Sequence, residues 1–294
     1  MTRALVLGGG GPVGIAWESG LVAGLAEGGV NIGKADLIIG TSAGSAVGAQ
    51  LAMGRSPQQM YAAVAADSGN TRPGPTRANT GAGGAPPDLT PLMDLMQKAG
   101  RGDVPAEEVR KEMGAFALAA NTMSEEAFIA TFGRMLATSE GWPEKKYMCT
   151  AVDAVDGTFV TWSNDSGVPM SRAIASSCSV PGVYPPITIN GRRYIDGGMR
   201  SGTNADLAKG YDTVIVVAVT TGVEGPMADV SKKRLEDEMA TLKDSGSSVT
   251  LITPDATSCE AFGVNLMDFS RRSGAADAGL AQGRAEAEAL KGKW

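Results

Sequence analysis

The chain has 294 residues, which is long enough to bury the core of one large α/β domain or of two small ones. Its 26 basic and 32 acidic residues give a net charge of −6, which argues against nucleic acid as a main partner, because neutralising phosphates needs a basic surface. The sequence contains no histidine, which excludes Ser-His-Asp and Cys-His catalysis and histidine-ligated zinc and haem. Any nucleophile in this protein must therefore use a different base.

Cysteine content and hydropathy bear on the compartment of the protein. Cys149, Cys178 and Cys259 are far apart and form no Cys-x-x-Cys pair, so we expect reduced structural thiols. The N-terminus carries no apolar stretch followed by a small-residue cleavage site. The longest clean apolar run, residues 214–219, is far shorter than the roughly 20 residues that span a bilayer. We therefore expect a cytoplasmic protein without a signal peptide or a transmembrane segment.

The N-terminal pattern is typical of a parallel α/β sheet. Residues 4–7 and 37–39 are short apolar runs, which predict two buried strands. Residues 15–27 predict a helix with an apolar inner face, and residues 43–53 predict a helix of small residues. The order strand, turn, helix, strand, turn, helix indicates that the two strands lie parallel in one sheet.

The middle of the chain changes in composition. Residues 68–91 are rich in glycine and proline and nearly free of aliphatic side chains, which predicts a flexible loop. Three helical patterns follow, at residues 89–99, 106–119 and 124–137. We expect them to form a helical cap insertion, residues 92–140, over one end of the sheet.

Strand patterns return in the second half of the chain. Two pairs of strand-like runs are separated by the turn dipeptides Asp156-Gly157 and Asn190-Gly191, so each pair predicts a β-hairpin. The four runs are residues 147–152, 158–162, 187–189 and 193–195. The remaining predicted elements are two buried strands at residues 214–219 and 249–252 and two helices at residues 231–243 and 275–290.

A glycine-rich loop follows the first predicted strand. Gly9, Gly11 and Gly14 fit the pattern Gly-x-Gly-x-x-Gly at the start of a helix. Such a loop offers unhindered backbone N–H groups to a dinucleotide pyrophosphate, or to any other negatively charged oxygen. A dinucleotide site also needs an acidic residue at the C-terminal end of the second strand, whereas Asp36 precedes that strand. The loop alone leaves a nucleotide-binding oxidoreductase as an alternative.

The second predicted strand is followed by Gly40-Thr41-Ser42-Ala43-Gly44, which fits Gly-x-Ser-x-Gly. Between a strand and a helix, this pattern places the serine on a sharp, strained turn, and the glycines remove side chains that would clash there. Ser42 would then lie at a helix N-terminus, where the helix dipole favours a developing alkoxide. The competing interpretation is a glycine-rich turn with an incidental serine.

A carboxyl group that could act as the base follows the second hairpin. Asp196 is followed by Gly197 and Gly198, which leave room to aim its side chain into a site. An Asp-Gly-Gly sequence on its own is more typical of a plain turn. Asp196 therefore gains its interest from its combination with Ser42 and the absence of histidine.

Together, the glycine-rich loop, the Gly-x-Ser-x-Gly elbow, the late Asp-Gly-Gly and the absence of histidine resemble the patatin-like phospholipase family. Residues 173–186, an Ala/Ser-rich stretch ending in Pro-Gly-Val-Tyr-Pro-Pro, are similar to the family's segment before the Asp-Gly-Gly strand. The resemblance covers residues 4–55 and 145–220. It implies a single patatin-like α/β domain over residues 1–294, in which helices flank a central, mostly parallel sheet as a three-layer sandwich.

The resemblance also implies a lipid acyl hydrolase of the phospholipase A or esterase type that needs no metal or other cofactor. Ser42 matches the family's nucleophile and Asp196 the carboxylate of its Ser-Asp dyad. The oxyanion loop is matched by Gly9, Gly10 and Gly11, and the N–H groups of the last two are expected to hold the oxyanion. The glycines that complete the motifs are Gly14, Gly40, Gly44, Gly197 and Gly198. The implied partner is a lipid or fatty-acyl ester, with transient contact to a membrane surface.

One position departs from the family pattern. Val13 stands where many members carry Arg or Lys, so the charge that a basic side chain would lend to the site is missing. This departure bears on selectivity for anionic substrates more than on catalysis. A side chain at Gly10 is expected to occupy the oxyanion position and to block turnover. A catalytically silent lipid-binding protein of the same fold is the second alternative.

Overall fold

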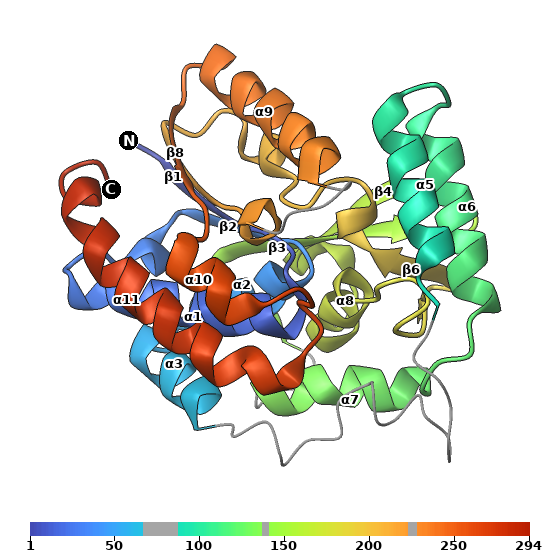
Figure 1. Cartoon of the computed structure of the whole chain (residues 1–294), viewed down its shortest axis with the longest axis horizontal. Coiled ribbons are helices and arrows are strands. Elements are labelled where there is room, and N and C mark those ends of the chain that lie inside the picture. The colour runs from blue at the N-terminus through green and yellow to red at the C-terminus, as the bar shows by residue number, and fades with distance from the viewer. Residues whose placement is uncertain (67–87, 137–140, 223–227) are drawn as a thin grey trace.

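The computed structural model describes residues 1–66, 88–136, 141–222 and 228–294 (Figure 1). Most of the loop predicted at residues 68–91 lies outside these ranges. None of the helices within them is both long and apolar enough to cross a membrane.

The centre of the molecule is an eight-stranded mixed sheet. Its strands are β1 (Arg3–Leu7), β2 (Leu37–Gly40), β3 (Lys146–Asp153), β4 (Phe159–Trp162), β5 (Ile187–Ile189), β6 (Arg192–Asp196), β7 (Thr213–Val217) and β8 (Ser248–Ile252). The strand order is β5-β6-β3-β2-β1-β7-β8, and β4 pairs with β3 outside this path. Strands β3, β2, β1, β7 and β8 are parallel, whereas β4, β6 and β5 pair antiparallel. The predicted parallel pairing of the first two strands is confirmed.

Both predicted hairpins are confirmed. Strand β3 pairs with β4 around Asp156-Gly157, and β5 pairs with β6 around Asn190-Gly191. Asn190 and Gly191 have φ values of 50° and 77°. Two successive left-handed residues are what a tight two-residue hairpin turn requires. The second hairpin ends with Asp196, which pairs with Ala151 of β3.

Helices cover both faces of the sheet. They are α1 (Gly11–Glu27), α2 (Ala43–Ala52), α3 (Pro57–Ala65), α5 (Thr90–Arg101), α6 (Ala106–Ala119), α7 (Glu125–Leu136), α8 (Met170–Ser177), α9 (Ala228–Asp244), α10 (Ala256–Phe262) and α11 (Arg272–Leu290). Alternate residues of β1 separate the two layers: Leu5 packs with Trp17 of α1, and Val6 packs with Leu235 of α9. Figure 1 shows α9 on one side of the sheet and α1, α2, α8 and α11 on the other. The predicted three-layer α/β architecture is confirmed.

The helices of the predicted insertion lie against the antiparallel half of the sheet. The α5–α6 pair covers Val152 and Ile195 on the same face as α9, through Val109 and Met113 of α6. Helix α7 packs against α8 on the opposite face. Residues 92–140 thus contribute to both faces, and their role as a cap remains a prediction.

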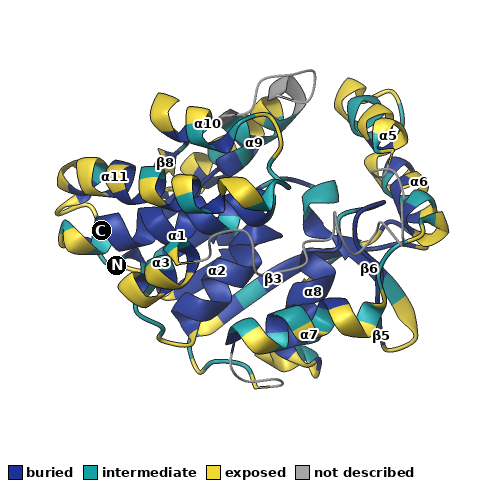
Figure 2. Ribbon diagram, turned by 60° about the horizontal axis from the view of Figure 1, so that its bottom comes forward, coloured by how far each residue is buried: buried dark blue, intermediate teal, exposed yellow. Residues whose placement is uncertain are grey.

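Helix α1 carries the glycine-rich loop at its N-terminus and is held rigidly in place. A Cβ atom at Gly20 or Gly24 would overlap a backbone carbonyl of α11, so the two helices approach at backbone distance. Trp17 donates a hydrogen bond from Nε1 to Ser258 Oγ at 3.0 Å. Figure 2 shows α1 and α2 as largely buried helices. The two helices that begin at the predicted motifs are therefore among the best-packed parts of the molecule.

Candidate active site

The Gly-x-Ser-x-Gly segment forms a strained elbow between β2 and α2. Ser42 has φ 52° and ψ −117°, a conformation that costs a residue other than glycine roughly 1–3 kcal/mol. A Cβ atom at Gly40 would overlap the backbone of Ser45, and one at Gly44 would overlap the carbonyl of Leu7. Both glycines are therefore required by close backbone approach, as a serine on a sharp strand-to-helix turn demands.

The C-terminal end of α8 holds this elbow. The Ser42 N–H group donates to Ser177 Oγ at 3.0 Å. The Ser42 carbonyl accepts hydrogen bonds from Ser45 Oγ at 2.6 Å and from Cys178 Sγ at 3.2 Å. Ser177 and Cys178 lie in the Ala/Ser-rich stretch, but nothing in that stretch identified them as supports of the elbow. The predicted free state of Cys149, Cys178 and Cys259 agrees with the structure.

Asp196 ends β6 and is buried beside Ser42. Its Oδ1 accepts a hydrogen bond from the Gly198 N–H group at 2.7 Å. Its Oδ2 is buried and accepts no hydrogen bond of ordinary geometry from the residues that the structure describes. Burial raises the pKa of Asp196 to about 7, while the Gly198 N–H and the neighbouring Ser42 hydroxyl act in the opposite direction. The carboxyl group thus has one oxygen held in place and one oxygen left for a proton.

A buried polar network joins the elbow to the turn that carries Asp196. The Asn204 side-chain amide donates hydrogen bonds from Nδ2 to Thr41 Oγ1 at 3.0 Å and to the Gly197 carbonyl at 3.3 Å. Thr41 Oγ1 in turn lies 2.9 Å from Thr150 Oγ1 of β3. Thr41 and Gly197 are the immediate neighbours of Ser42 and Asp196, so the network fixes the two proposed dyad residues relative to each other. Sequence analysis missed Asn204, since no local pattern marks it.

Some N–H groups of the glycine-rich loop hold the loop in place, and others are left without a partner in the described chain. Gly8 donates to the Val217 carbonyl at 3.0 Å and Gly9 to the Gly202 carbonyl at 2.7 Å. The N–H groups of Gly10 and Gly11 make no hydrogen bond to any residue that the structure describes. A Cβ atom at Gly9 would lie 3.3 Å from Ser42 Cβ, which places the loop directly beside the elbow. Gly10 and Gly11 are thus the loop donors available to a substrate oxygen.

A cavity of about 540 Å³ opens at Ser42. Its apolar wall comes from α1, α7 and the segment before α11, and includes Ile15, Met123, Phe128, Phe132, Met135 and Met267. The volume lies within the range of sites that enclose small organic ligands. Helix α7, which belongs to the predicted insertion, therefore lines the space in front of the nucleophile.

Comparison with known proteins decides the family. The sequence model described as patatin-like phospholipase matches residues 5–209, which are 205 of the 294 residues. The chain belongs to the patatin-like phospholipase family. The general activity that this membership supports is lipid acyl hydrolysis. A comparison with curated proteins gave no match.

The matches among solved structures include two proteins. One is VipD from Legionella pneumophila, with 13% identity and a TM-score of 0.45 over 98% of this chain and 67% of that chain. Another is the type III effector protein ExoU, with 15% identity and a TM-score of 0.39 over 98% of this chain and 53% of that chain. This patatin-like chain thus spans about two thirds of the first protein and about half of the second.

Two loop positions of this patatin-like protein, Gly10 and Val13, lie in tightly packed surroundings. A Cβ atom at Gly10 would lie 2.6 Å from Val219 Cγ1 and 2.9 Å from Gly14 Cα. A side chain at Gly10 would therefore clash with Val219 and displace the loop, and its expected effect on the oxyanion position stays a prediction. Val13 is fully buried and its N–H group donates to the Leu266 carbonyl at 3.2 Å. The residues that line the cavity at Ser42 include two basic ones, Arg134 and Arg272.

The nucleotide-binding alternative gains no support from the site. Asp36 precedes β2 and its Oδ2 accepts a hydrogen bond from the Arg3 N–H group at 2.7 Å. Arg3 begins β1, so this carboxylate lies at the opposite end of the sheet from the glycine-rich loop. At the C-terminal end of β2, where a ribose-binding acid is needed, the patatin elbow begins with Gly40.

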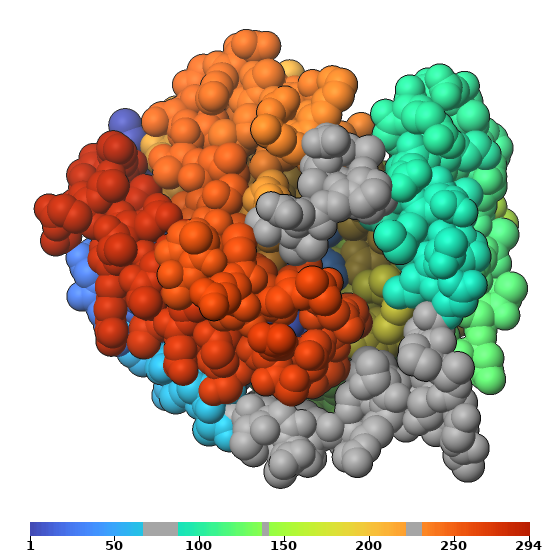
Figure 3. Space-filling view, viewed as in Figure 1, coloured from blue at the N-terminus to red at the C-terminus, as the bar shows by residue number. Residues whose placement is uncertain are grey.

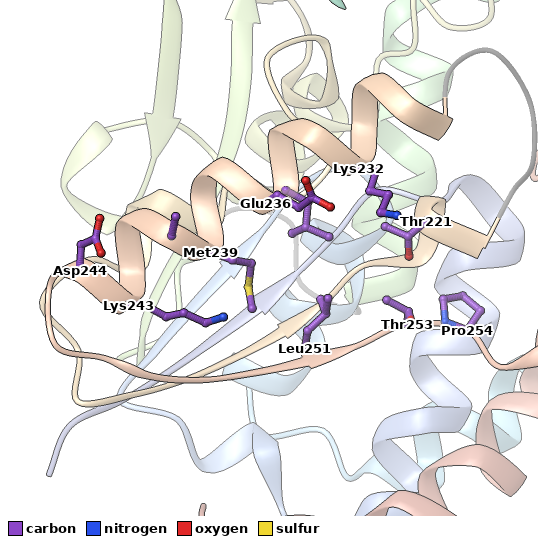
Figure 4. A pocket seen from close by; sticks show the side chains of 11 residues that line it. Thr221, Lys232, Glu236, Met239, Lys243, Asp244, Leu251, Thr253 and Pro254 are labelled. Atoms are coloured by element: carbon purple, nitrogen blue, oxygen red, sulfur yellow. The ribbon is translucent and has the colours of Figure 1, made fainter.

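A larger cavity of about 710 Å³ lies elsewhere in this patatin-like protein, between α9 and β8. Figure 4 shows Lys232, Glu236 and Lys243 of α9 along it, with Leu251 of β8 opposite. None of its lining residues belongs to the elbow, the glycine-rich loop or the Asp-Gly-Gly turn. The larger cavity therefore lies apart from the sequence-predicted site residues, whereas the cavity of about 540 Å³ has Ser42 in its lining.

Proposed function

We propose that this protein hydrolyses carboxylic esters of lipids with Ser42 as nucleophile and Asp196 as general base. The observation that carries the proposal is a strained serine that lies beside a buried carboxyl group at an apolar cavity. A base works best when its pKa lies near the working pH. With a pKa of about 7, Asp196 is partly ionised at neutral pH and still accepts a proton far better than an ordinary carboxylate does.

The proposed reaction balances with the groups that the site holds. Ser42 Oγ attacks the ester carbonyl carbon while Asp196 Oδ2 takes the hydroxyl proton, and the oxyanion accepts hydrogen bonds from Gly10 and Gly11 N–H. Collapse of this intermediate breaks the bond to the alcohol, which leaves with the proton from Asp196. Water then attacks the acyl-enzyme, gives a proton to Asp196 and releases the fatty acid as Ser42 recovers its hydrogen. A fixed oxyanion donor is worth on the order of 3 kcal/mol.

The apolar cavity favours fatty-acyl over acetyl esters. Each methylene group that the cavity buries contributes about 0.8 kcal/mol, or roughly fourfold in kcat/KM. We therefore expect kcat/KM for neutral p-nitrophenyl esters to rise with acyl length. A flat dependence on acyl length would show that the cavity lined by Phe128 and Phe132 does not hold the acyl chain.

A fluorophosphonate probe tests the nucleophile directly. The wild-type protein should be labelled, and mass spectrometry should place the adduct on Ser42. Ser42→Ala should not be labelled, whereas Ser245→Ala, which removes an exposed hydroxyl at the end of α9, should be labelled like the wild type. Failure of the folded wild-type protein to react would favour the catalytically silent lipid-binding alternative.

A further inference from the structure

A groove separate from the two cavities described above lies on the face of the sheet that α9 shares with the α5–α6 pair. It encloses about 370 Å³, and the loop that follows Asp196 forms part of its lining through Gly198 and Gly202. Figure 1 shows α9 and the α5–α6 pair as separate blocks on this face, and Figure 3 shows the surface hollowed beside the α5–α6 pair. Neither the family comparison nor the proposed chemistry assigns a role to this groove.

The groove gathers positive charge in a chain that is acidic overall. Its charged lining residues are Arg110, Arg200, Lys233, Arg234 and Asp237. Two of the four cations are already neutralised: Arg200 binds Asp206 through two hydrogen bonds of 2.6 and 2.9 Å, and Lys233 binds Asp237 at 3.1 Å. The remaining two guanidinium groups are the ones that matter for a ligand.

Arg110 and Arg234 keep most of their hydrogen-bonding capacity unused. The one hydrogen bond that Arg110 makes within the described residues runs from Nε to the Gly157 carbonyl at 2.7 Å. Arg234 lies 3.8 Å from Glu238, too far for a hydrogen bond, and donates none to the residues that the structure describes. Arg234 is thus ion-paired with Glu238, but both arginines keep N–H groups that meet no acceptor within the described chain, so a ligand that supplies negative oxygens would be stabilised here.

The electrostatic environment of Arg110 agrees with this geometry. Burial is the main cause that lowers the pKa of Arg110, and the positive charges of Arg200 and Arg234 lower it further, while Glu107 opposes them. Arg200 and Arg234 are therefore close enough to Arg110 to affect its titration. The fork of a guanidinium group matches the oxygen spacing of a phosphate, and the two forks with unused donors, those of Arg110 and Arg234, match several oxygens of one phosphate group better than those of a carboxylate.

We propose that this groove, lined by Arg110, Arg200 and Arg234, binds a phosphate group. Met96, Met113 and Met199 also line the groove, so it suits a ligand with an apolar part next to the phosphate. The ligand would contact the backbone of Gly198, whose N–H holds Asp196, and of Gly202, whose carbonyl holds Gly9. Occupancy of the groove is thereby coupled to both proposed parts of the catalytic site.

Calorimetry with two probes tests the proposal without any catalytic step, so its outcome is independent of the proposed hydrolysis. Glycerol phosphate and monomeric short-chain phosphatidylglycerol are titrated into Ser42→Ala protein and into the same protein carrying Arg110→Gln, Arg110→Lys or Lys243→Gln. Arg110→Gln should weaken binding by about tenfold or more, because a charge-assisted pair is lost. Arg110→Lys should weaken it less. Lys243→Gln removes the same charge from the exposed end of α9 and should change nothing.

The outcomes distinguish a lipid head group from a free phosphate ester, and they also show whether the proposal fails. Tighter binding of phosphatidylglycerol than of glycerol phosphate supports a lipid head group, and equal binding supports a free phosphate ester. If Arg110→Gln does not fold, Arg234→Gln replaces it, since Arg234 loses no described hydrogen bond. The proposal is overturned if neither probe binds, if the arginine variants bind as tightly as the parent, or if Lys243→Gln weakens binding equally.

Discussion

Asp196 and Glu18 are two buried carboxyl groups in different regions of this molecule, and their surroundings make them chemically unlike. Asp196 lies at the end of β6 beside Ser42, and Glu18 lies inside α1 with no exposed surface. Burial is the main cause that raises the pKa of both groups. Gly198 N–H binds one oxygen of Asp196, whereas neither oxygen of Glu18 has a hydrogen bond of ordinary geometry within the described chain, although the nearby Gly8 backbone slightly opposes the shift.

The difference shows how far burial alone determines the pKa of a carboxyl group. Desolvation drives a carboxyl group toward its neutral form, as at Glu18, where burial raises the pKa well above its ordinary value. A single backbone donor and a neighbouring hydroxyl moderate the same effect at Asp196, whose pKa of about 7 suits proton transfer. Position next to a nucleophile and partial hydrogen bonding, more than burial, distinguish the proposed base.

The largest expected effect comes from Asp196→Asn. The amide has nearly the same size but cannot accept the Ser42 proton, so kcat/KM for a neutral ester should fall by roughly 10²- to 10⁴-fold at every pH. Steady-state assays measure the change, and circular dichroism checks that the fold is intact. Wild-type turnover in this variant would refute the dyad and direct attention to another carboxylate.

A smaller loss of activity is expected from Gly10→Ala, in the loop that Glu18 approaches at Gly8. The new methyl group would meet Val219 and push the loop out of place. Removing an oxyanion donor costs about 10²- to 10³-fold in kcat, so a displaced donor should cost roughly tenfold to a hundredfold. Gly133→Ala, in open space on α7, is the matched control and should retain activity. Equal rates for both variants and the wild type would remove Gly10 from the oxyanion site.

Stability should respond to pH through Asp196. Its folded-state pKa of about 7 exceeds the ordinary value near 3.9, so the folded protein retains a proton that the unfolded chain releases between these pH values. The contribution to the free energy of unfolding is full below pH 4 and is lost as pH rises through 7, by up to about 4 kcal/mol. Asp196→Asn should therefore raise the melting temperature at pH 8 relative to the wild type, with little gain at pH 4. The opposite sign would show an ordinary, ionised carboxylate.

The smallest effect on activity is expected from Glu18→Gln. The change removes a titrating carboxyl group of the core, so it should stabilise the protein at alkaline pH and leave kcat/KM for a neutral ester unchanged. Thermal melts at two pH values and steady-state assays provide the two readings. A loss of activity as large as that of Asp196→Asn would erase the distinction between the two carboxyl groups.

Local patterns in the sequence predicted much of the fold. Apolar runs bounded by glycine predicted β1 and β2, and Asn190-Gly191 predicted a turn whose left-handed residues the structure contains. Helices α3, α8 and α10 were not predicted. Helix α8 is the instructive case: its three serines weaken the helix preference that its alanines supply, and burial of nearly all its residues accompanies its helical structure.

The site shows the same division between local and distant information. The elbow at Ser42 and the loop at Gly9 are local turns, so their glycine spacing was sufficient to predict them. Asn204 and Ser177 act through contacts over more than 130 positions of chain. A pairing of that separation leaves no periodic trace in one sequence. The pKa of Asp196 is equally a property of packing, which composition cannot supply.

The pH dependence of kcat/KM for a neutral short-chain ester tests the central claim most directly. Without histidine, an acid limb near neutral pH must come from a group with a shifted pKa, and Glu18→Gln and Asp196→Asn distinguish the two buried carboxyl groups whose pKa is raised. The account predicts a single acid limb with an apparent pKa of about 7 in the wild type and in Glu18→Gln, with circular dichroism showing an intact fold over the same range. Asp196→Asn should retain only a low activity without this limb. An unchanged rate and an unchanged limb in Asp196→Asn would contradict the account.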